Sequence, residues 1–115
     1  MAQLTTGIIE NTAVSGVRPS TNLVVRISND DTVTITVLIK GFFVSGTTKT
    51  EYVEEFITIS PGNIVTRNNY AQFDAFEFQF ATSSDAVEIS AWGKDASGNL
   101  TAAHRAVPAE LNPIG

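Results

Sequence analysis

Short runs of alternating apolar and polar residues limit the fold of this chain more than any other feature of its sequence. In residues 32–42, TVTITVLIKGF, the odd positions from Val33 to Ile39 are apolar, whereas positions 32, 34 and 36 are threonine. Successive side chains of a strand point to opposite faces, so this pattern predicts a strand with one buried face. The same reasoning predicts strands in the runs TNLVVRIS, EYVEEFITI, IVTRNN, FDAFEFQFAT, AVEISAWGK and LTAAHRAV.

Turn-forming residues separate these runs at intervals typical of an all-β domain. SPGN places Pro61 and Gly62 at the centre of an expected type II turn, and the glycines of GFFVSGTTKT predict a bend or connection. A helical period is approached best by AAHRAVPAEL, which Pro108 interrupts. With the N-terminal run included, about eight short strands and no convincing helix predict a jelly-roll-like antiparallel β-sandwich with an N-terminal extension.

Charge and composition narrow the classes of partner. Seven basic against twelve acidic residues give a formal charge of −5, which repels a phosphate backbone, so we expect no binding of nucleic acid. There is no cysteine, which excludes disulfides and thiolate metal sites. No run approaches the roughly 18 apolar residues that span a bilayer, so we expect no membrane insertion. The first dozen residues also lack the pattern of a classical signal peptide.

Candidate catalytic groups are few. His104 is the single histidine, and no serine lies in a GxSxG or comparable context, so we interpret His104 as an ordinary strand or surface residue. Glu54 and Glu55 are adjacent and point to opposite faces of a strand, which prevents them from acting as a carboxylate pair. An inward Glu55 could be a catalytic acid with a raised pKa, but an edge-strand or ion-pair role is favoured. We expect no enzymatic activity and no catalytic residue.

Oxygen-rich loops raise the question of a metal site. NDD at residues 29–31 and DASGN at residues 95–99 have the side chains that calcium prefers, but neither supplies the alternating ligands and closing glutamate of a calcium-binding loop. Asp, Asn, Ser and Gly are also the residues that tight turns require for backbone reasons. We therefore interpret both loops as turns, and we expect neither a metal site nor a cofactor.

Aromatic residues offer an alternative function. Alternation assigns Phe76, Phe78 and Phe80 to a buried face, where their large apolar area is best used. Trp92, Tyr52 and Tyr70 remain as candidates for a row of exposed rings that stack on sugars. The alternative to a structural role is therefore a surface-displayed β-sandwich that binds a carbohydrate or another ligand.

The chain begins with a strand-like run that stands apart from the others. LTTGIIE, residues 4–10, precedes the small-residue stretch NTAVSGVRPS, about ten residues that could reach roughly 30 Å if extended. The sequence is thus divided into a connector arm, residues 1–20, and a sandwich domain, residues 21–115. An extended arm can add a strand to a sheet edge of another copy or pack within its own domain, and we expect the former. The expected subunit contacts are Leu4, Ile8, Ile9, Val14 and Val17.

Two stretches carry a resemblance to a known family. They are NLVVRISNDDTVTITVLIKGF and FEFQFATSSDAVEISAWGKDASGNLTAAHRAVPAEL, in which AWGKDASGNLTAAHR forms an expected closing hairpin. From about Leu23 to Leu111 the chain resembles the subunits of bacterial endospore appendages, the jelly-roll pilins that bacilli assemble on their spores. The resemblance implies a self-assembling structural protein whose arm, Met1 to about Ser20, contacts neighbouring subunits. Many such pilins carry cysteines that link subunits, and this chain has none.

Together these observations predict a non-enzymatic subunit of a protein fibre. Its expected partner is itself, in a homo-oligomer or helical polymer built by arm docking and β-augmentation, with a possible anchor or tip protein. The resemblance implies a location on the spore surface or outside the cell, reached by release with the spore and without a signal peptide.

Overall fold

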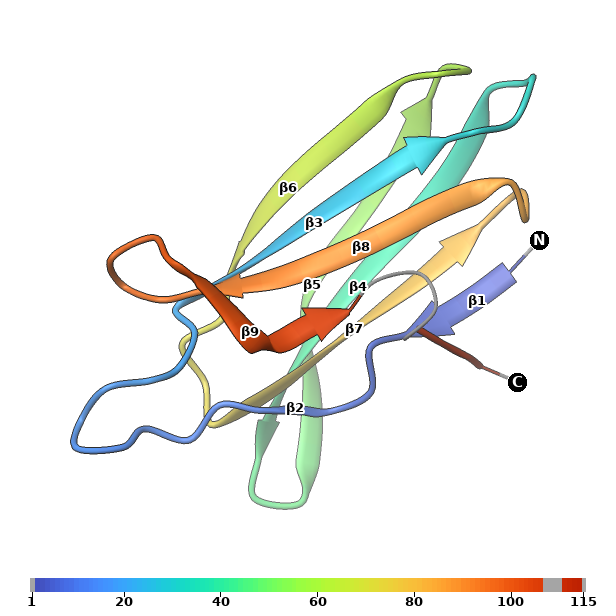
Figure 1. The fold of residues 1–115 in the computed structure, drawn as a ribbon. Coiled ribbons are helices and arrows are strands. Elements are labelled where there is room, and N and C mark those ends of the chain that lie inside the picture. Colours follow the sequence, from blue (N-terminus) through green and yellow to red (C-terminus); the bar gives the residue numbers. More distant parts are fainter. Residues whose placement is uncertain (1, 107–110, 115) are drawn as a thin grey trace.

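The chain folds into two antiparallel β-sheets packed face to face (Figure 1). The structure is a computed structural model, which describes residues 2–106 and 111–114. These residues form ten strands and no helix, so no helix among them is suited to cross a membrane. The strands are β1 (Ala2–Thr5), β2 (Ile9–Glu10), β3 (Asn22–Asn29), β4 (Ile35–Ser45), β5 (Thr48–Ile59), β6 (Ile64–Tyr70), β7 (Ala75–Thr82), β8 (Val87–Lys94), β9 (Leu100–Ala106) and β10 (Asn112–Pro113).

The order of the strands is that of a chain wound as a jelly roll. Sheet one has the order β10-β1-β7-β4-β5, with β2 also paired to β7, and sheet two has the order β6-β3-β8-β9. The pairs β4 with β5, β3 with β6, and the N-terminal strands with β7 are nested in the sequence and alternate between the two sheets. Nested antiparallel pairs of this kind arise when one long hairpin is wrapped around a core. The predicted all-β, jelly-roll-like sandwich is confirmed.

The core lies between the inward faces predicted by alternation. Phe76, Phe78 and Phe80 of β7 are buried together with apolar residues of β3, β4, β5 and β8. Val33 was expected to share the buried face of residues 32–42, but it is 58% exposed. The reason is that β4 begins only at Ile35, so Val33 belongs to the preceding turn, where alternation does not determine which side is buried.

Two connections can be compared with their predictions. The SPGN turn forms as expected, with Gly62 at a φ of 77° and the Asn63 amide donating to the Ser60 carbonyl at 3.1 Å. The GFFVSGTTKT stretch has a β-bulge at its first glycine, where the register of β4 against β5 shifts between Gly41 and Phe42, but the chain does not turn back there. Instead β4 continues to Ser45 and turns at Gly46, because Gly41 lets the ring of Phe78 pass where a Cβ would lie within 2.8 Å of it.

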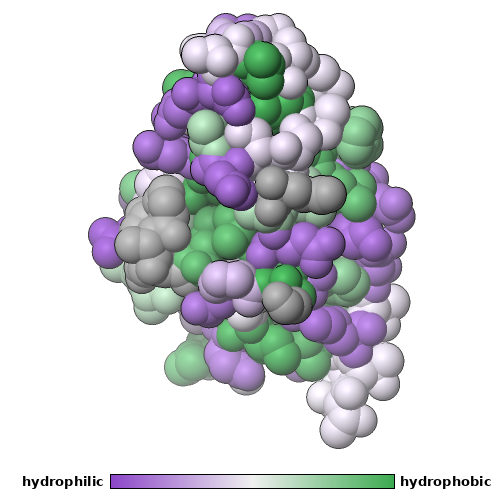
Figure 2. Space-filling model, turned by 90° about the vertical axis from the view of Figure 1, so that its right-hand side faces the viewer, coloured by the Kyte–Doolittle hydropathy of each residue, from purple (hydrophilic) through white to green (hydrophobic). Residues whose placement is uncertain are grey.

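The N-terminal residues belong to the sandwich, which corrects the expected boundary after residue 20. β1 pairs with β7 from Ala2 opposite Thr82 to Thr5 opposite Gln79, and β2 continues along the same strand. β1 also pairs with β10, so both chain ends lie on one side of the molecule (Figure 1). Figure 2 shows that side, where hydrophobic and hydrophilic residues are interspersed. The described sandwich therefore starts at residue 2.

Candidate functional site: the N-terminal seam

The N-terminal seam, defined as residues 2–11 lying along residues 74–82, is the part of the fold that bears most directly on assembly. The backbone hydrogen bonds to β7 continue between β1 and β2, where the Thr6 amide donates to the Phe78 carbonyl at 3.0 Å. At its far end the Asn11 amide donates to the Asp74 carbonyl at 2.8 Å. Gly7, with a φ of 70°, takes up the extra residue that the N-terminal side carries here. The segment thus covers the whole length of β7.

The five predicted contact residues divide into two groups. Leu4 and Ile9 are partly buried and pack against the core of their own chain. Ile8, Val14 and Val17 point outward and are 57%, 71% and 65% exposed. Leu4 and Ile9 therefore contact the core of their own chain, whereas the side chains of the other three are exposed.

A buried carboxylate fastens β1 to β7 from the outer face of sheet one. Thr5 donates a hydrogen bond to Glu77, Lys49 pairs with it at 2.7 Å, and Gln79 Nε2 donates to it at 3.2 Å. Burial alone would raise the pKa of the Glu77 carboxyl, but the hydrogen bonds from Lys49, Thr5 and Gln79 outweigh that effect and hold the pKa below its usual 4.5. By alternation Glu77 lies on the face of β7 opposite Phe76 and Phe78. It is only 5% exposed because Lys49 folds over it from the β4–β5 hairpin.

Asn11 closes the seam at the other end, and the sequence analysis missed it. Its Nδ2 donates to the carbonyls of Ser20 at 2.8 Å, Ala71 at 2.9 Å and Phe73 at 3.1 Å. Its Oδ1 accepts from the Ser20 amide at 2.8 Å. The side chain is fully buried and fully satisfied, although it lies in a stretch read as a linker.

Residues 12–19 project from the sandwich as a small hairpin. Val14 and Val17 exchange backbone hydrogen bonds of 2.8 and 3.0 Å across Ser15 and Gly16, which have φ values of 54° and 78°. Two consecutive positive φ values define a tight turn of type I′. Arg18 then ties the base of the loop to Asp74 at 2.7 Å. The loop is folded back on itself, and its tip has no contact with the core.

His104 contacts the seam from β9. It is 6% exposed, and its Nδ1 lies 2.6 Å from the hydroxyl oxygen of Ser20. Burial lowers the pKa of His104, and a hydrogen bond to the backbone of Glu10 only partly offsets this. Ser20 is fully buried, so the Ser20–His104 pair joins β9 to the start of the sandwich body, and the hydrogen bond to Glu10 joins His104 to the N-terminal segment. The expected strand histidine is therefore an internal one, not a surface one.

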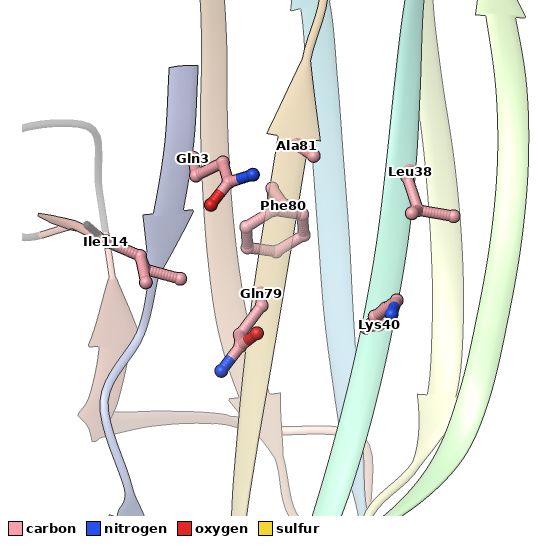
Figure 3. Close-up of a pocket in the computed structure, with 7 residues that line it drawn as sticks. All are labelled: Gln3, Leu38, Lys40, Gln79, Phe80, Ala81 and Ile114. Atoms are coloured by element: carbon pink, nitrogen blue, oxygen red, sulfur yellow. The ribbon is translucent and has the colours of Figure 1, made fainter.

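Two hollows flank the seam. One, of about 440 Å³, lies between residues 6–10 and residues 103–106 of β9. The other, of about 210 Å³, lies on the outer face of sheet one beside β1 (Figure 3). Gln3, Gln79 and Lys40 approach it from three neighbouring strands, so its lining mixes polar and apolar groups. Neither hollow brings together a nucleophile, a base and an orienting group among the described residues.

The remaining charged candidates have structural partners. Glu55 leans inward at the edge of sheet one and pairs at 2.7 Å with Arg67 of sheet two, a partner that the sequence did not name. Asp31 accepts from Ser84, which holds its pKa below the usual value, and Asp95 accepts from the amides of Ser97 and Asn99. Both loops are turns stabilised by their own carboxylates. Within the described ranges, no three acidic or histidine side chains are grouped to hold a metal ion.

The three aromatic candidates do not form a row. Tyr52 and Tyr70 both contact Phe73, with ring centroids 4.8 and 5.3 Å apart, in a cluster that includes Phe43. Burial raises the pKa of Tyr52, whose hydroxyl donates to the Tyr70 carbonyl. Trp92 stands apart from them on the outer face of sheet two, and its strand faces solvent on that side.

Fold and seam together define an all-β sandwich whose first strands complete its own sheet. No family model and no curated protein matches the chain. Among solved structures, the crystal structure of Thermotoga maritima 1070 is similar, with a TM-score of 0.59 and 13% sequence identity over 98% of this chain and 90% of that one. A likeness at this identity supports the β-sandwich fold alone.

Proposed function

We propose that the protein is a self-assembling structural subunit, and that it polymerises when its N-terminal segment occupies the β7 edge of a neighbouring copy. The observation that carries this proposal is the construction of the seam. Residues 2–11 supply a complete strand for β7, and they are joined to the rest of the chain only through the projecting loop 12–19. A strand attached in this way can be exchanged between identical copies.

Exchange conserves almost every contact of the seam. Leu4 and Ile9 would pack against the core of the neighbour as they pack against the core of their own chain. Thr5 would donate its hydrogen bond to Glu77 of the neighbouring copy. Asn11 moves with the segment and Ser20 stays with the body, so their hydrogen bonds form between two chains as well as within one. What is lost within each chain is the short Val14–Val17 hairpin and the reach of Arg18 back to Asn11.

Loop 12–19 is the hinge of the proposed exchange. Eight residues between Asn11 and Ser20 can extend to about 27 Å, at roughly 3.4 Å for each residue. When each copy gives its segment to the next, the contact is head-to-tail, which produces rings or open filaments. The exposed side chains of Ile8, Val14 and Val17 then lie at the junction between subunits.

A disulfide experiment tests where the segment lies. The chain has no cysteine, and Gln3 is directly opposite Ala81 on the outer face of the seam. Cross-strand neighbours at this spacing can be bridged. Chains carrying Gln3→Cys are mixed with chains carrying Ala81→Cys, left to exchange, and oxidised. We expect a disulfide-linked pair on a denaturing gel, and Gln3→Cys mixed with Ser97→Cys is the control that should give none.

Variants of loop 12–19 test whether closing the loop reduces assembly and opening it increases assembly. Asn-Gly is the preferred type I′ turn, so Ser15→Asn should favour the closed loop and reduce assembly, whereas Gly16→Val should open it and increase assembly. Light scattering and negative-stain microscopy measure the assembly of both variants. Monomers from every variant at high concentration, with no cross-linked pair, would contradict the proposal.

The location of the fibre is part of the same proposal. The resemblance to spore appendage subunits supports a place on the spore surface, with an anchor or tip protein as a further partner. Antibody labelling of intact spores tests this, and a signal confined to the cell interior would contradict it.

A further inference from the structure

We propose that the outer face of sheet two binds an acidic pyranose, a six-membered sugar ring that carries a carboxylate, at Trp92. Trp92 lies between Ser90 and Lys94 on β8 and directly opposite Val24 on β3, the strand beside it in Figure 1. This site lies on the sheet opposite the N-terminal seam, so the proposal does not rest on the exchange of the N-terminal segment.

Two hollows of this face include Trp92 in their linings. A hollow of about 260 Å³ is lined by Val24, Arg26, Trp92, Lys94 and Leu100. A second hollow, of about 220 Å³, shares Arg26 and Trp92 and continues toward Ser28, Ile64, Glu88 and Ser90. The two hollows share Arg26 and Trp92 in their linings, and together they are called the groove here.

The basic side chains beside Trp92 favour an anionic ligand. Arg26 and Lys94 make no ion pair among the described residues, and no acidic side chain lines the first hollow. Four other basic side chains each face a carboxylate: Arg18, Lys40, Lys49 and Arg67. On a chain of net charge −5, two basic groups left unpaired beside the single tryptophan form a local site for an anion.

The shape of the groove favours a sugar over a small inorganic anion. The apolar C–H face of a pyranose can stack on the indole, with Val24 and Leu100 completing an apolar rim. A guanidinium binds a carboxylate through two parallel hydrogen bonds, which suits Arg26 to the acidic group of the sugar. In the second hollow the hydroxyls of Ser28 and Ser90 and the carboxylate of Glu88 can bond the hydroxyls of a neighbouring ring.

Tryptophan fluorescence follows this site alone, because Trp92 is the one tryptophan of the chain. Purified full-length protein is titrated with hexagalacturonate while the tryptophan emission is followed. We expect a saturable change that weakens as salt is added. Arg26→Ala should weaken binding about tenfold or more, the loss expected for one charge-assisted contact. Trp92→Phe, measured by calorimetry, should weaken binding as well.

Two controls make the result specific. Lys40→Ala removes a basic side chain from the outer face of the other sheet and should leave the affinity unchanged. A neutral galactose hexamer should bind at least tenfold more weakly than the acidic one, about the worth of one such contact. The proposal is overturned by an absence of any saturable response, by equal binding of both sugars, or by an unchanged affinity in Arg26→Ala. It is also overturned if the emission changes with protein concentration alone and Arg26→Ala abolishes that change, because a second copy then covers the groove.

Discussion

Asn11 and Ser20 hold each other through two hydrogen bonds, one in each direction. Asn11 Nδ2 donates to the Ser20 carbonyl at 2.8 Å, and the Ser20 backbone amide donates to Asn11 Oδ1 at 2.8 Å. The two residues bracket loop 12–19, so they close the loop when the segment before it stays on its own sheet, and they would join two chains if that segment moved to a neighbour. This pair defines where the N-terminal segment ends and the hinge begins.

Replacement of Asn11 should therefore destabilise the protein strongly. Asn11→Ala removes four hydrogen bonds and leaves the carbonyls of Ala71 and Phe73 without this donor. Buried polar groups without partners cost about 1–3 kcal/mol each, so we expect the free energy of unfolding to fall by about 3 kcal/mol. Urea unfolding measures the change, and Asn68→Ala on the exposed side of β6 is the control. A loss below about 1 kcal/mol would contradict the role given to Asn11.

Glu77 should make the protein sensitive to acid. Its pKa is lower in the folded chain than in the unfolded one, so its contribution to stability is complete above pH 4.5 and is lost as the pH falls through the folded value. Glu77→Gln should remove this part of the pH dependence and cost about 1–2 kcal/mol at pH 7, because the contact with Lys49 loses its charge. Unfolding curves between pH 7 and 3 measure both effects. Glu54→Gln on the exposed face of β5 is the matched control, and an equal response of the two variants would contradict the prediction.

Alternation predicted those parts of the fold that depend on local pattern. It placed Phe76, Phe78 and Phe80 on the buried face, because a half-buried strand repeats every two residues. The turn at Gly62 was equally readable, since only glycine adopts its positive φ without strain. Where the local pattern stopped, as at Val33, the prediction failed.

Long-range pairing could not be read from the same pattern. Thr5 meets Gln79 across more than seventy positions of sequence, and nothing local in LTTGIIE indicates β7 as its neighbour. Asn11 looked like part of a linker because its partners at Ser20, Ala71 and Phe73 are carbonyls, which every residue possesses. The burial of Glu77 likewise depends on Lys49, which reaches it from another strand.

His104 should produce a second pH dependence in a different range. Burial lowers its folded pKa below 6.5, so the unfolded chain takes up a proton more readily than the folded one. Stability is then complete above about pH 6.5 and declines as the pH falls below it toward the folded value. Because His104 is the single histidine, its replacement by Gln should flatten the change in urea midpoint between pH 7.5 and 5.5. The same slope in the wild type and in His104→Gln would contradict this prediction.

Gly93 allows Ser20 and His104 to approach each other. A Cβ at position 93 would lie 2.1 Å from Ser20 Oγ and 2.9 Å from His104 Cβ, both closer than real atoms pack. Gly93→Ala should therefore cost about 2–3 kcal/mol of unfolding free energy, the usual cost of overfilling a packed site. Removal of the nearest obstacle provides the decisive control, because Gly93→Ala should cost less when Ser20→Gly is already present. Since the two side chains share one site, strictly additive losses would show that Gly93 does not act through this contact.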